Sequence, residues 1–335
     1  MNPTPTNVFG RGAIAAGAVL LTMMADAPAA RSDEPVRITD DPPARVEAPA
    51  PLPSARRLVR RFTFEESSER PLQLPLYFDQ HVDAAGGFAP FGVIRPVDDH
   101  AADGRWSFGF EVNGTSLAAQ LQRGVIPVLP DADYEVSVQG RTAGLRRARA
   151  GFDVWLMDAT GAELPGSRVV GPRVRTEGEW TMLTVSLSNN GDAAADLGLE
   201  LVLLQPERQS PGGSPARAAP DLAGGAWFDD IRIRHTPRID LSSPVHGNIF
   251  TPRTPPAIDI RVCDFTQEAL SGRLVVEDLS GDTVSSRFFD RFRCSEPTRI
   301  AVPVTTPGWY RAAFELTGPS GMLGRKTLNF VVVGD

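Results

Sequence analysis

Short segments in which apolar and polar residues alternate dominate the chain from about residue 58 onward. The run Trp106-Ser107-Phe108-Gly109-Phe110 alternates large apolar residues with small or polar ones at a period of two. This period predicts a β-strand with one buried face. Because no segment between such runs shows helical periodicity over three turns, the pattern predicts an all-β protein.

The alternating segments fall into two blocks. Turn residues such as Asn113-Gly114 and Asn190-Gly191 separate the segments of the first block. Their number suits a jelly roll. The predicted strands of this block are 59–65, 74–79, 106–110, 116–121, 134–138, 151–157, 180–187, 197–204 and 224–234. A Pro/Gly/Ser/Ala-rich stretch, 205–224, is interpreted as a flexible excursion before the last strand.

The length and even spacing of the strands in the second block are typical of an immunoglobulin-like sandwich. Its predicted strands are 258–263, 273–278, 283–290, 298–304, 308–316 and 326–333. We therefore expect a jelly-roll β-sandwich over residues 58–236, followed by a smaller immunoglobulin-like β-sandwich over residues 237–335.

The first 29 residues have the features of an export signal. Arg11 supplies a positive charge, 13–25 are mainly apolar, and Ala27-Pro28-Ala29 resembles a cleavage site. The apolar run is shorter than the roughly 20 residues that span a bilayer. We expect a mature chain without a membrane span that is secreted, periplasmic or at the cell surface, with a disordered Pro-rich linker over residues 30–57.

Charge and cysteine content narrow the function further. The net charge is -7, with pI ≈ 5.3. This balance argues against a nucleic-acid partner or an anionic membrane surface, since both need a concentrated basic face. Cys263 and Cys294 are the only cysteines. In an exported protein a disulfide between them is expected to contribute roughly 3 to 4 kcal/mol, and two unpaired buried thiols are the alternative.

Several short motifs resemble those of known families. In the first block, the motifs at 62–66, 134–138 with Arg141, 179–180 and 226–233 together resemble galactose-binding-like jelly rolls, in particular the carbohydrate-binding modules of xylanases and cellulases. In the second block, 308–311 and 328–333 resemble the immunoglobulin-like domains that precede catalytic domains in bacterial glycosidases.

The resemblance implies a ligand, a cofactor and partners. The ligand would be a polysaccharide or oligosaccharide, and the partner a glycosidase domain or a cell-surface component. Many members of the family hold a structural calcium, for which Glu65 and Asp229 are the matching carboxylates here. The alternative is that Asp229 and Asp230 form a turn or pair with Arg232 or Arg234. Trp227 and Ile231 are expected to seal the first sandwich.

Candidate ligand-binding residues follow from the alternation along four strands. If Phe152 and its alternate neighbours face the core, then Asp153 and Trp155 face outward, and the same reasoning places Gln139 and Glu200 outside. We expect these residues on one concave surface, because sugars bind to aromatic planes flanked by amides and carboxylates. The alternative is that the second domain or a loop covers Trp155.

Catalytic motifs are weak in this sequence. No strand carries alternating acids on one face, and no Ser lies in a nucleophile-elbow pattern. His81, His100, Asp98 and Asp99 could meet as a metal or acid/base cluster, with a solvated loop as the alternative. The sequence favours an exported, non-catalytic carbohydrate-binding or glycosidase-accessory protein. A glycan hydrolase or lyase that uses the jelly-roll face, and an adhesion or scaffold protein without sugar affinity, are the alternatives.

Overall fold

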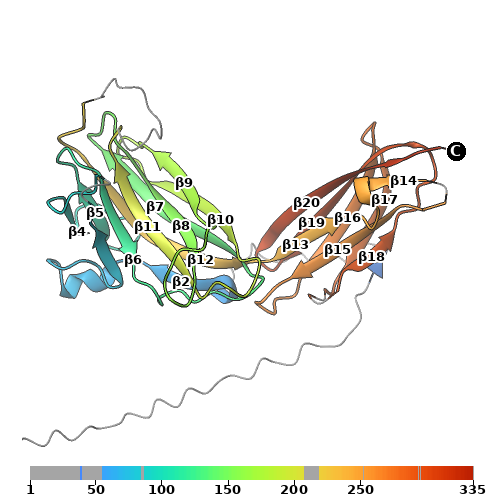
Figure 1. The fold of residues 1–335 in the computed structure, drawn as a ribbon, viewed down its shortest axis with the longest axis horizontal. Helices are drawn as coiled ribbons and strands as arrows, with labels where there is room; N and C mark the ends of the chain where they lie inside the picture. Colours follow the sequence, from blue (N-terminus) through green and yellow to red (C-terminus); the bar gives the residue numbers. More distant parts are fainter. Residues whose placement is uncertain are drawn as a thin grey trace, which may run out of the picture. The chain divides into compact units, whose positions relative to one another are not determined.

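The computed structural model describes residues 38–39, 55–83, 87–206, 219–251, 253–292, 294 and 296–334. These residues form two β-sandwiches, so the expected all-β fold class is confirmed (Figure 1). Across them, no helix has the length and apolar character needed to cross a membrane. The predicted signal peptide, most of the predicted linker and residues 207–218 of the excursion lie outside the described residues.

Two antiparallel sheets make up the first sandwich. The β12 sheet has the order β10 (Thr181–Ser188), β7 (Asp133–Ala143), β12 (Gly225–Thr236), β5 (Ser107–Glu111), β4 (Val93–Val97), and β2 (Leu58–Phe62) also pairs with β12. The β8 sheet has the order β3 (Phe78–His81), β6 (Leu117–Leu121), β11 (Asp196–Leu204), β8 (Arg149–Met157), β9 (Val169–Val174).

The core lies between these two sheets and follows the predicted alternation. Phe152, Val154 and Leu156 of β8 are buried in the same cluster as Tyr134 and Val136 of β7. Burying a side chain of this size removes enough apolar surface to contribute about 1.5 to 3 kcal/mol. The alternate residues of each strand therefore lie on the outer faces of the sheets.

Two strands of this sandwich, β4 and β9, were absent from the sequence prediction. Each contains a proline, Pro96 or Pro172, and each lies at the edge of its sheet. Proline cannot donate to the hydrogen-bond ladder, so it argues against a central strand but is tolerated at an edge.

Strand β12 is the centre of its sheet. Its first half pairs with β5 and its second half with β2, and the exchange of partners occurs at Asp229-Asp230. There the register with β7 shifts, and Asp230 has a positive φ of 44°. Asp230 and Ile231 therefore lie opposite a single residue of β7, Val138, and form a bulge.

Trp227 does not seal the core, contrary to the prediction. It lies on the outer face of the β12 sheet, where the Arg141 guanidinium is 5.3 Å from its ring centroid and the His100 ring is 4.7 Å away, edge-on. Ile231 is fully buried, as predicted. The bulge at Asp230-Ile231 breaks the strict alternation along β12.

The second sandwich has its own core. Its strands are β1 (Ile38–Thr39), β13 (Arg238–Ser242), β14 (Ile249–Phe250), β15 (Ala257–Cys263), β16 (Ser271–Asp278), β17 (Thr283–Phe289), β18 (Thr298–Ala301), β19 (Gly308–Gly318) and β20 (Gly321–Val332). One sheet has the order β1-β17-β16-β19-β20-β14 and the other β13-β15-β18. The predicted disulfide between Cys263 and Cys294 is confirmed.

Two short elements lie within the predicted linker. Ile38–Thr39 pairs with the end of β17. Ala55–Arg57 forms a 3₁₀ turn, and the Arg57 guanidinium is buried against Asp264 (2.9 Å) and Glu268 (2.8 Å). The prediction of a disordered linker up to residue 57 is therefore wrong at its end, since a buried ion-paired arginine fixes this turn.

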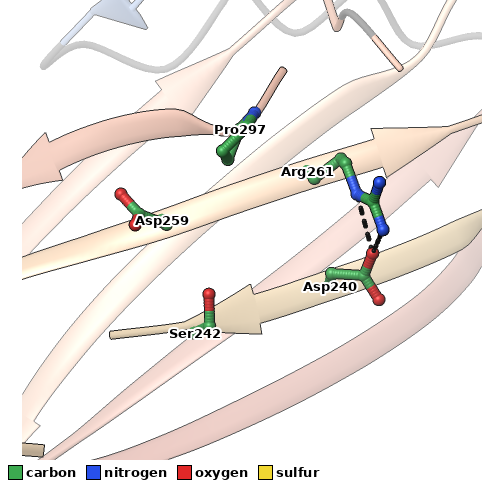
Figure 2. A pocket seen from close by; sticks show the side chains of 5 residues that line it. All are labelled: Asp240, Ser242, Asp259, Arg261 and Pro297. Atoms are coloured by element: carbon green, nitrogen blue, oxygen red, sulfur yellow. Dashed lines mark hydrogen bonds and ion pairs between the residues drawn. The ribbon is translucent and has the colours of Figure 1, made fainter. Parts of the chain in front are cut away.

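A shallow pocket of about 360 Å³ lies over β13 and β15, and Figure 2 shows its lining. Asp240 and Arg261 face each other across the two strands and form an ion pair of 2.6 Å. Asp259 pairs with Arg299 of β18 at 2.8 Å. The carboxylates of this pocket are thus neutralised by neighbouring arginines.

Candidate functional site

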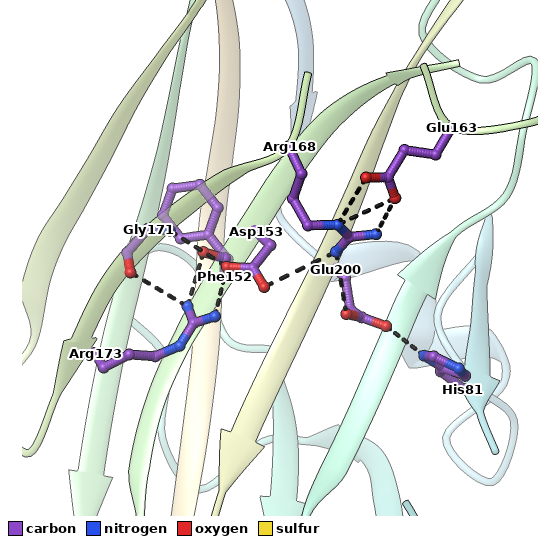
Figure 3. Close-up of polar contacts among 8 residues, drawn as sticks. All are labelled: His81, Phe152, Asp153, Glu163, Arg168, Gly171, Arg173 and Glu200. Carbon is purple, nitrogen blue, oxygen red and sulfur yellow. Dashed lines mark hydrogen bonds and ion pairs between the residues drawn. The ribbon is translucent and has the colours of Figure 1, made fainter. Parts of the chain in front are cut away.

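The outer face of the β8 sheet carries a connected group of charged side chains (Figure 3). Trp155 lies on the same face, in contact with Arg168 of this group. Asp153 of β8 lies directly opposite Glu200 of β11, and Trp155 lies opposite Gly198. Of the four predicted ligand-binding residues, the structure therefore brings Asp153, Trp155 and Glu200 together on one face.

Trp155 packs between the backbone of β11 and the Arg168 side chain of this group. A Cβ at Gly198 would lie 2.3 Å from its indole ring, so the ring lies close against the backbone of β11. From the other side, the Arg168 guanidinium is 4.0 Å from the ring centroid, a cation–π contact. Trp155 is consequently only 3% exposed, which agrees with the alternative that a loop covers it.

Arg168 links the carboxylates of the group. It pairs with Glu163 at 2.5 Å and approaches Asp153 at 3.9 Å and Glu200 at 3.8 Å. Although partial burial opposes the charge, the carboxylates, Glu163 first, raise the pKa of Arg168. Arg168 therefore remains a cation, which compensates the buried charges of Asp153 and Glu200.

The group ends in a second arginine on one side and a histidine on the other. Arg173 of β9 pairs with Asp153 at 2.5 Å and donates to the Phe152 carbonyl at 2.9 Å. His81 Nδ1 of β3 bonds Glu200 Oε1. The side chains of His81 and Arg168 are 36% and 34% exposed, so a ligand can reach them, whereas Asp153 and Glu200 lie behind them.

Gln139 does not join this face, and the prediction of one surface for all four residues is wrong in this respect. Gln139 is on β7, where it pairs with Met182 of β10 and Asp229 of β12. The alternation along β7 places its side chain outside, but β7 belongs to the opposite sheet. Gln139 and Trp155 are thus on opposite faces of the sandwich.

The two predicted calcium ligands instead hold one loop. Glu65 Oε1 accepts from the amides of Arg105 and Trp106, both at 2.8 Å. Asp229 Oδ2 accepts from the amides of Ala102 (2.8 Å) and Asp103 (3.0 Å). Amide hydrogens point at these oxygens, so the residues fit a cation poorly. Calcium stays a prediction, and unfolding temperatures with and without a chelator would test it.

Asp229 is fully buried, and this burial dominates its titration. Desolvation raises the pKa of Asp229 to about 6, in spite of the amide bonds from Ala102, Asp103 and Asp230, which lower it. A buried carboxylate is costly to ionise in the absence of a cation.

Asp230 forms the ion pairs expected as the alternative to calcium. Its carboxylate binds Arg61 at 2.6 Å and also pairs with Arg232. Burial acts against ionisation here, but the hydrogen bonds and charges of Arg232 and Arg61 lower the pKa of Asp230 overall. The bulge residue is thus held by guanidinium groups from β2 and β12.

The histidine cluster considered from the sequence does not assemble. His81 bonds Glu200, whereas His100 lies against Trp227 and 3.7 Å from Asp99. Within the ranges described above, no three His, Cys, Asp or Glu side chains are grouped in a way that could hold a metal ion.

Sequence reasoning missed four members of the group: His81 as a partner of Glu200, and Glu163, Arg168 and Arg173. Glu163 and Arg168 precede β9, and Arg173 is within it. The only available signal was Val169-Val170-Gly171-Pro172, in which the proline obscured an edge strand.

Comparison with known proteins gives only remote structural similarities. No protein-family model and no curated protein matches the sequence. The CBM22-1 xylan-binding domain of Paenibacillus barcinonensis Xyn10C aligns with 14% identity over 53% of this chain and 94% of that one, with a TM-score of 0.34. The C-terminal family 22 carbohydrate-binding module of Clostridium thermocellum Xyn10B aligns with 14% identity over 54% and 96%, with a TM-score of 0.35. A β-glucuronidase from Ruminococcus gnavus aligns with 12% identity over 78% and 46%, with a TM-score of 0.23. Scores this low leave the function of the chain open.

Proposed function

We propose that this protein is an exported, non-catalytic carbohydrate-binding or glycosidase-accessory protein that binds a polysaccharide on the outer face of the β8 sheet. The observation that carries the proposal is the group formed by His81, Asp153, Arg168, Arg173 and Glu200 on that face. Sugar hydroxyls both donate and accept hydrogen bonds. On this face the Arg168 guanidinium offers donors, and the partly exposed Glu163 carboxylate beside it offers acceptors.

The sequence motifs support the same proposal, because they resemble carbohydrate-binding modules. In the proposed site, Arg168 and His81 contact the sugar, and Asp153 and Glu200 orient them from behind. Trp155 supports Arg168 from below and does not stack on the sugar directly, since its ring is covered.

Affinity electrophoresis against a panel of soluble polysaccharides tests the proposal. We expect at least one polysaccharide to retard the wild-type protein. Glu200→Gln keeps the side-chain shape but removes the charge that orients His81 and Arg168, so affinity should fall about tenfold or more. Glu111→Gln is the matched control, because Glu111 pairs with Arg95 on the outer face of the opposite sheet.

Two results would contradict the binding proposal. The first is that no polysaccharide in the panel retards the protein. The second is that both substitutions weaken retardation equally, because the effect would then not belong to the β8 sheet. The unfolding temperature of each variant is measured alongside, to separate loss of binding from loss of fold.

A hydrolase remains the second candidate, because two buried carboxylates lie side by side. Asp153 and Glu200 are direct cross-strand neighbours, and glycosidases use a pair of carboxylates. Release of reducing ends from a retarding polysaccharide, abolished by Glu200→Gln, would support the hydrolase and overturn the non-catalytic function.

A further inference from the structure

One end of the β8 sheet carries an excess of exposed arginines. Arg146 and Arg147 lie in the turn between β7 and β8, Arg149 begins β8, and Arg175 follows the end of β9; all four are exposed. We call these four residues the arginine end. The chain as a whole has a net charge of -7, so the arginine end is a positively charged region on a negatively charged protein.

Contacts on the backbone show that these residues are close neighbours. Ala150 pairs with Val174, and Gly151 with Arg173, so Arg149 and Arg175 lie one step further along the same strand pair. Arg175 also donates to the backbone carbonyl of Arg146.

Arg149 and Arg175 face the same side as the candidate site. The core-facing residues of β8 are Ala150, Phe152 and Val154, which leaves Arg149 on the outer face with Asp153 and Trp155. The arginine end therefore continues the outer face of the β8 sheet beyond Arg173, whose guanidinium holds Asp153 (Figure 3).

Within the described ranges, few carboxylates lie beside Arg149 and Arg175, whereas the Arg147 guanidinium is already engaged by the Ala219 carbonyl at 3.0 Å. Glu177 is 80% exposed and 4.0 Å from Arg175, and Asp153 is engaged by Arg173 and Arg168. Asp221 lies under the turn, but its Oδ2 accepts from the backbone amides of Arg146, Arg147 and Ala148 at 2.8 to 2.9 Å. Among the described residues no carboxylate pairs with the exposed Arg149 side chain, so its guanidinium can bind a ligand.

The turn is also held rigidly. The buried Asp221 carboxylate accepts hydrogen bonds from three consecutive backbone amides. The Gln205 side chain accepts from the Asp221 amide at 2.9 Å and donates to the Asp221 carbonyl at 3.1 Å. A fixed turn presents its arginine side chains without the entropic cost of ordering a loop.

We infer that the polysaccharide bound by this protein is anionic, carrying carboxylate or sulfate groups that the arginine end binds. The inference rests on the proposed function and specifies its substrate class. Guanidinium groups bind carboxylate and sulfate oxygens through two parallel N–H donors, which an ammonium or a neutral group cannot match. A repeating acidic polymer would run from the arginine end onto the group around Arg168.

Matched pairs of polysaccharides separate charge from sugar structure. Polygalacturonate is compared with its highly methyl-esterified form, and dextran sulfate with dextran, by affinity electrophoresis at several salt concentrations. We expect the charged member of at least one pair to retard the protein more strongly, with retardation that decreases as salt rises. Which pair responds shows whether carboxylate or sulfate is the bound group.

A double variant locates the charge recognition. Arg149→Gln with Arg175→Gln should weaken binding of the charged polymer about tenfold and flatten its salt dependence. The matched control is Arg311→Gln with Arg325→Gln, which removes two exposed arginines from the second sandwich. The control should bind as the wild type does.

The possible failures are distinguishable. If neutral polysaccharides bind as well as charged ones and Glu200→Gln weakens both, the proposed function holds and the anionic ligand is wrong. The same conclusion follows if the charged polymer binds but the double variant has no effect. If no polysaccharide binds, both are wrong. If DNA of similar length binds as tightly as the acidic polysaccharide, and the double variant weakens it, a nucleic acid replaces the glycan as the partner.

Discussion

At the scale of single residues, the pKa of a carboxyl group in this protein depends on the groups that surround it. Asp229 and Asp230 are adjacent, yet their pKa values move in opposite directions. Asp229 is fully buried among backbone amides, whereas Asp230 contacts two guanidinium groups. Amides alone leave a buried carboxylate costly to ionise, while an opposite charge stabilises its ionised form.

Asp229 should make stability depend on pH. Its pKa of about 6 in the folded state is above its ordinary value of 3.8. The folded state therefore binds the proton more tightly than the unfolded state. The stabilisation is complete below about pH 4 and is lost as pH rises through about 6, by a total of about 3 kcal/mol.

Unfolding midpoints of the wild type and Asp229→Asn between pH 4 and 8 measure this contribution. The stability difference, wild type minus variant, should decrease as pH rises through about 6. Other titrating groups are common to both proteins and cancel in the difference. A difference that stays constant over this range would contradict the assignment to Asp229.

At the scale of elements, edge strand β9 and the loop before it complete the candidate site. Arg168 and Arg173 reach over β8 from this segment, and each contacts Asp153. The site also depends on close packing between β8 and β11, where Gly198 leaves space for the Trp155 ring. The glycine is needed here because any side chain would overlap the indole.

Gly198→Ala should therefore displace Trp155 and destabilise the first sandwich by about 1 to 3 kcal/mol, the usual cost of overpacking. Displacement would change the contact between the indole and the Arg168 guanidinium. Because the surroundings of Trp155 change, the intrinsic tryptophan fluorescence should change as well. Gly191→Ala is the control, since nothing lies within 4 Å of its added Cβ.

Thermal unfolding and fluorescence emission of both variants provide the measurement. If Gly198→Ala and Gly191→Ala have the same small effect on both, the tight contact between Gly198 and Trp155 does not exist in solution.

At the scale of the whole molecule, each of the two sandwiches has its own apolar core. The Cys263–Cys294 bond lies in the second sandwich and joins two residues that are 31 positions apart in the sequence. Its effect on stability should therefore be confined to that sandwich.

Replacing both cysteines with alanine should lower the stability of the second sandwich by roughly 3 to 4 kcal/mol. Calorimetry should show one transition moving to lower temperature, while a second, from the first sandwich, stays in place. A single transition that shifts as a whole would show instead that the two sandwiches unfold cooperatively.

The sequence by itself determined which face of most strands is buried. The sequence correctly assigned Phe152 and Val154 to the core and Asp153 and Trp155 to the outer face, because successive side chains of a strand point to opposite sides. The prediction failed at Trp227, because the bulge at Asp230-Ile231 reverses the alternation between Trp227 and Ile231. The two proline-containing edge strands were missed because proline carries the same signal in a loop as at a sheet edge.

Only the tertiary structure decided which outer residues share a surface. Gln139 and Asp153 are equally good outward positions in the sequence, but β7 and β8 belong to opposite sheets. Arg168 and Arg173 reach Asp153 because β9 pairs with β8, and Glu200 faces Asp153 because β11 is the other neighbour of β8. Strand order joins residues far apart in the chain, whereas alternation is a property of adjacent residues, so the local pattern contains no information about it.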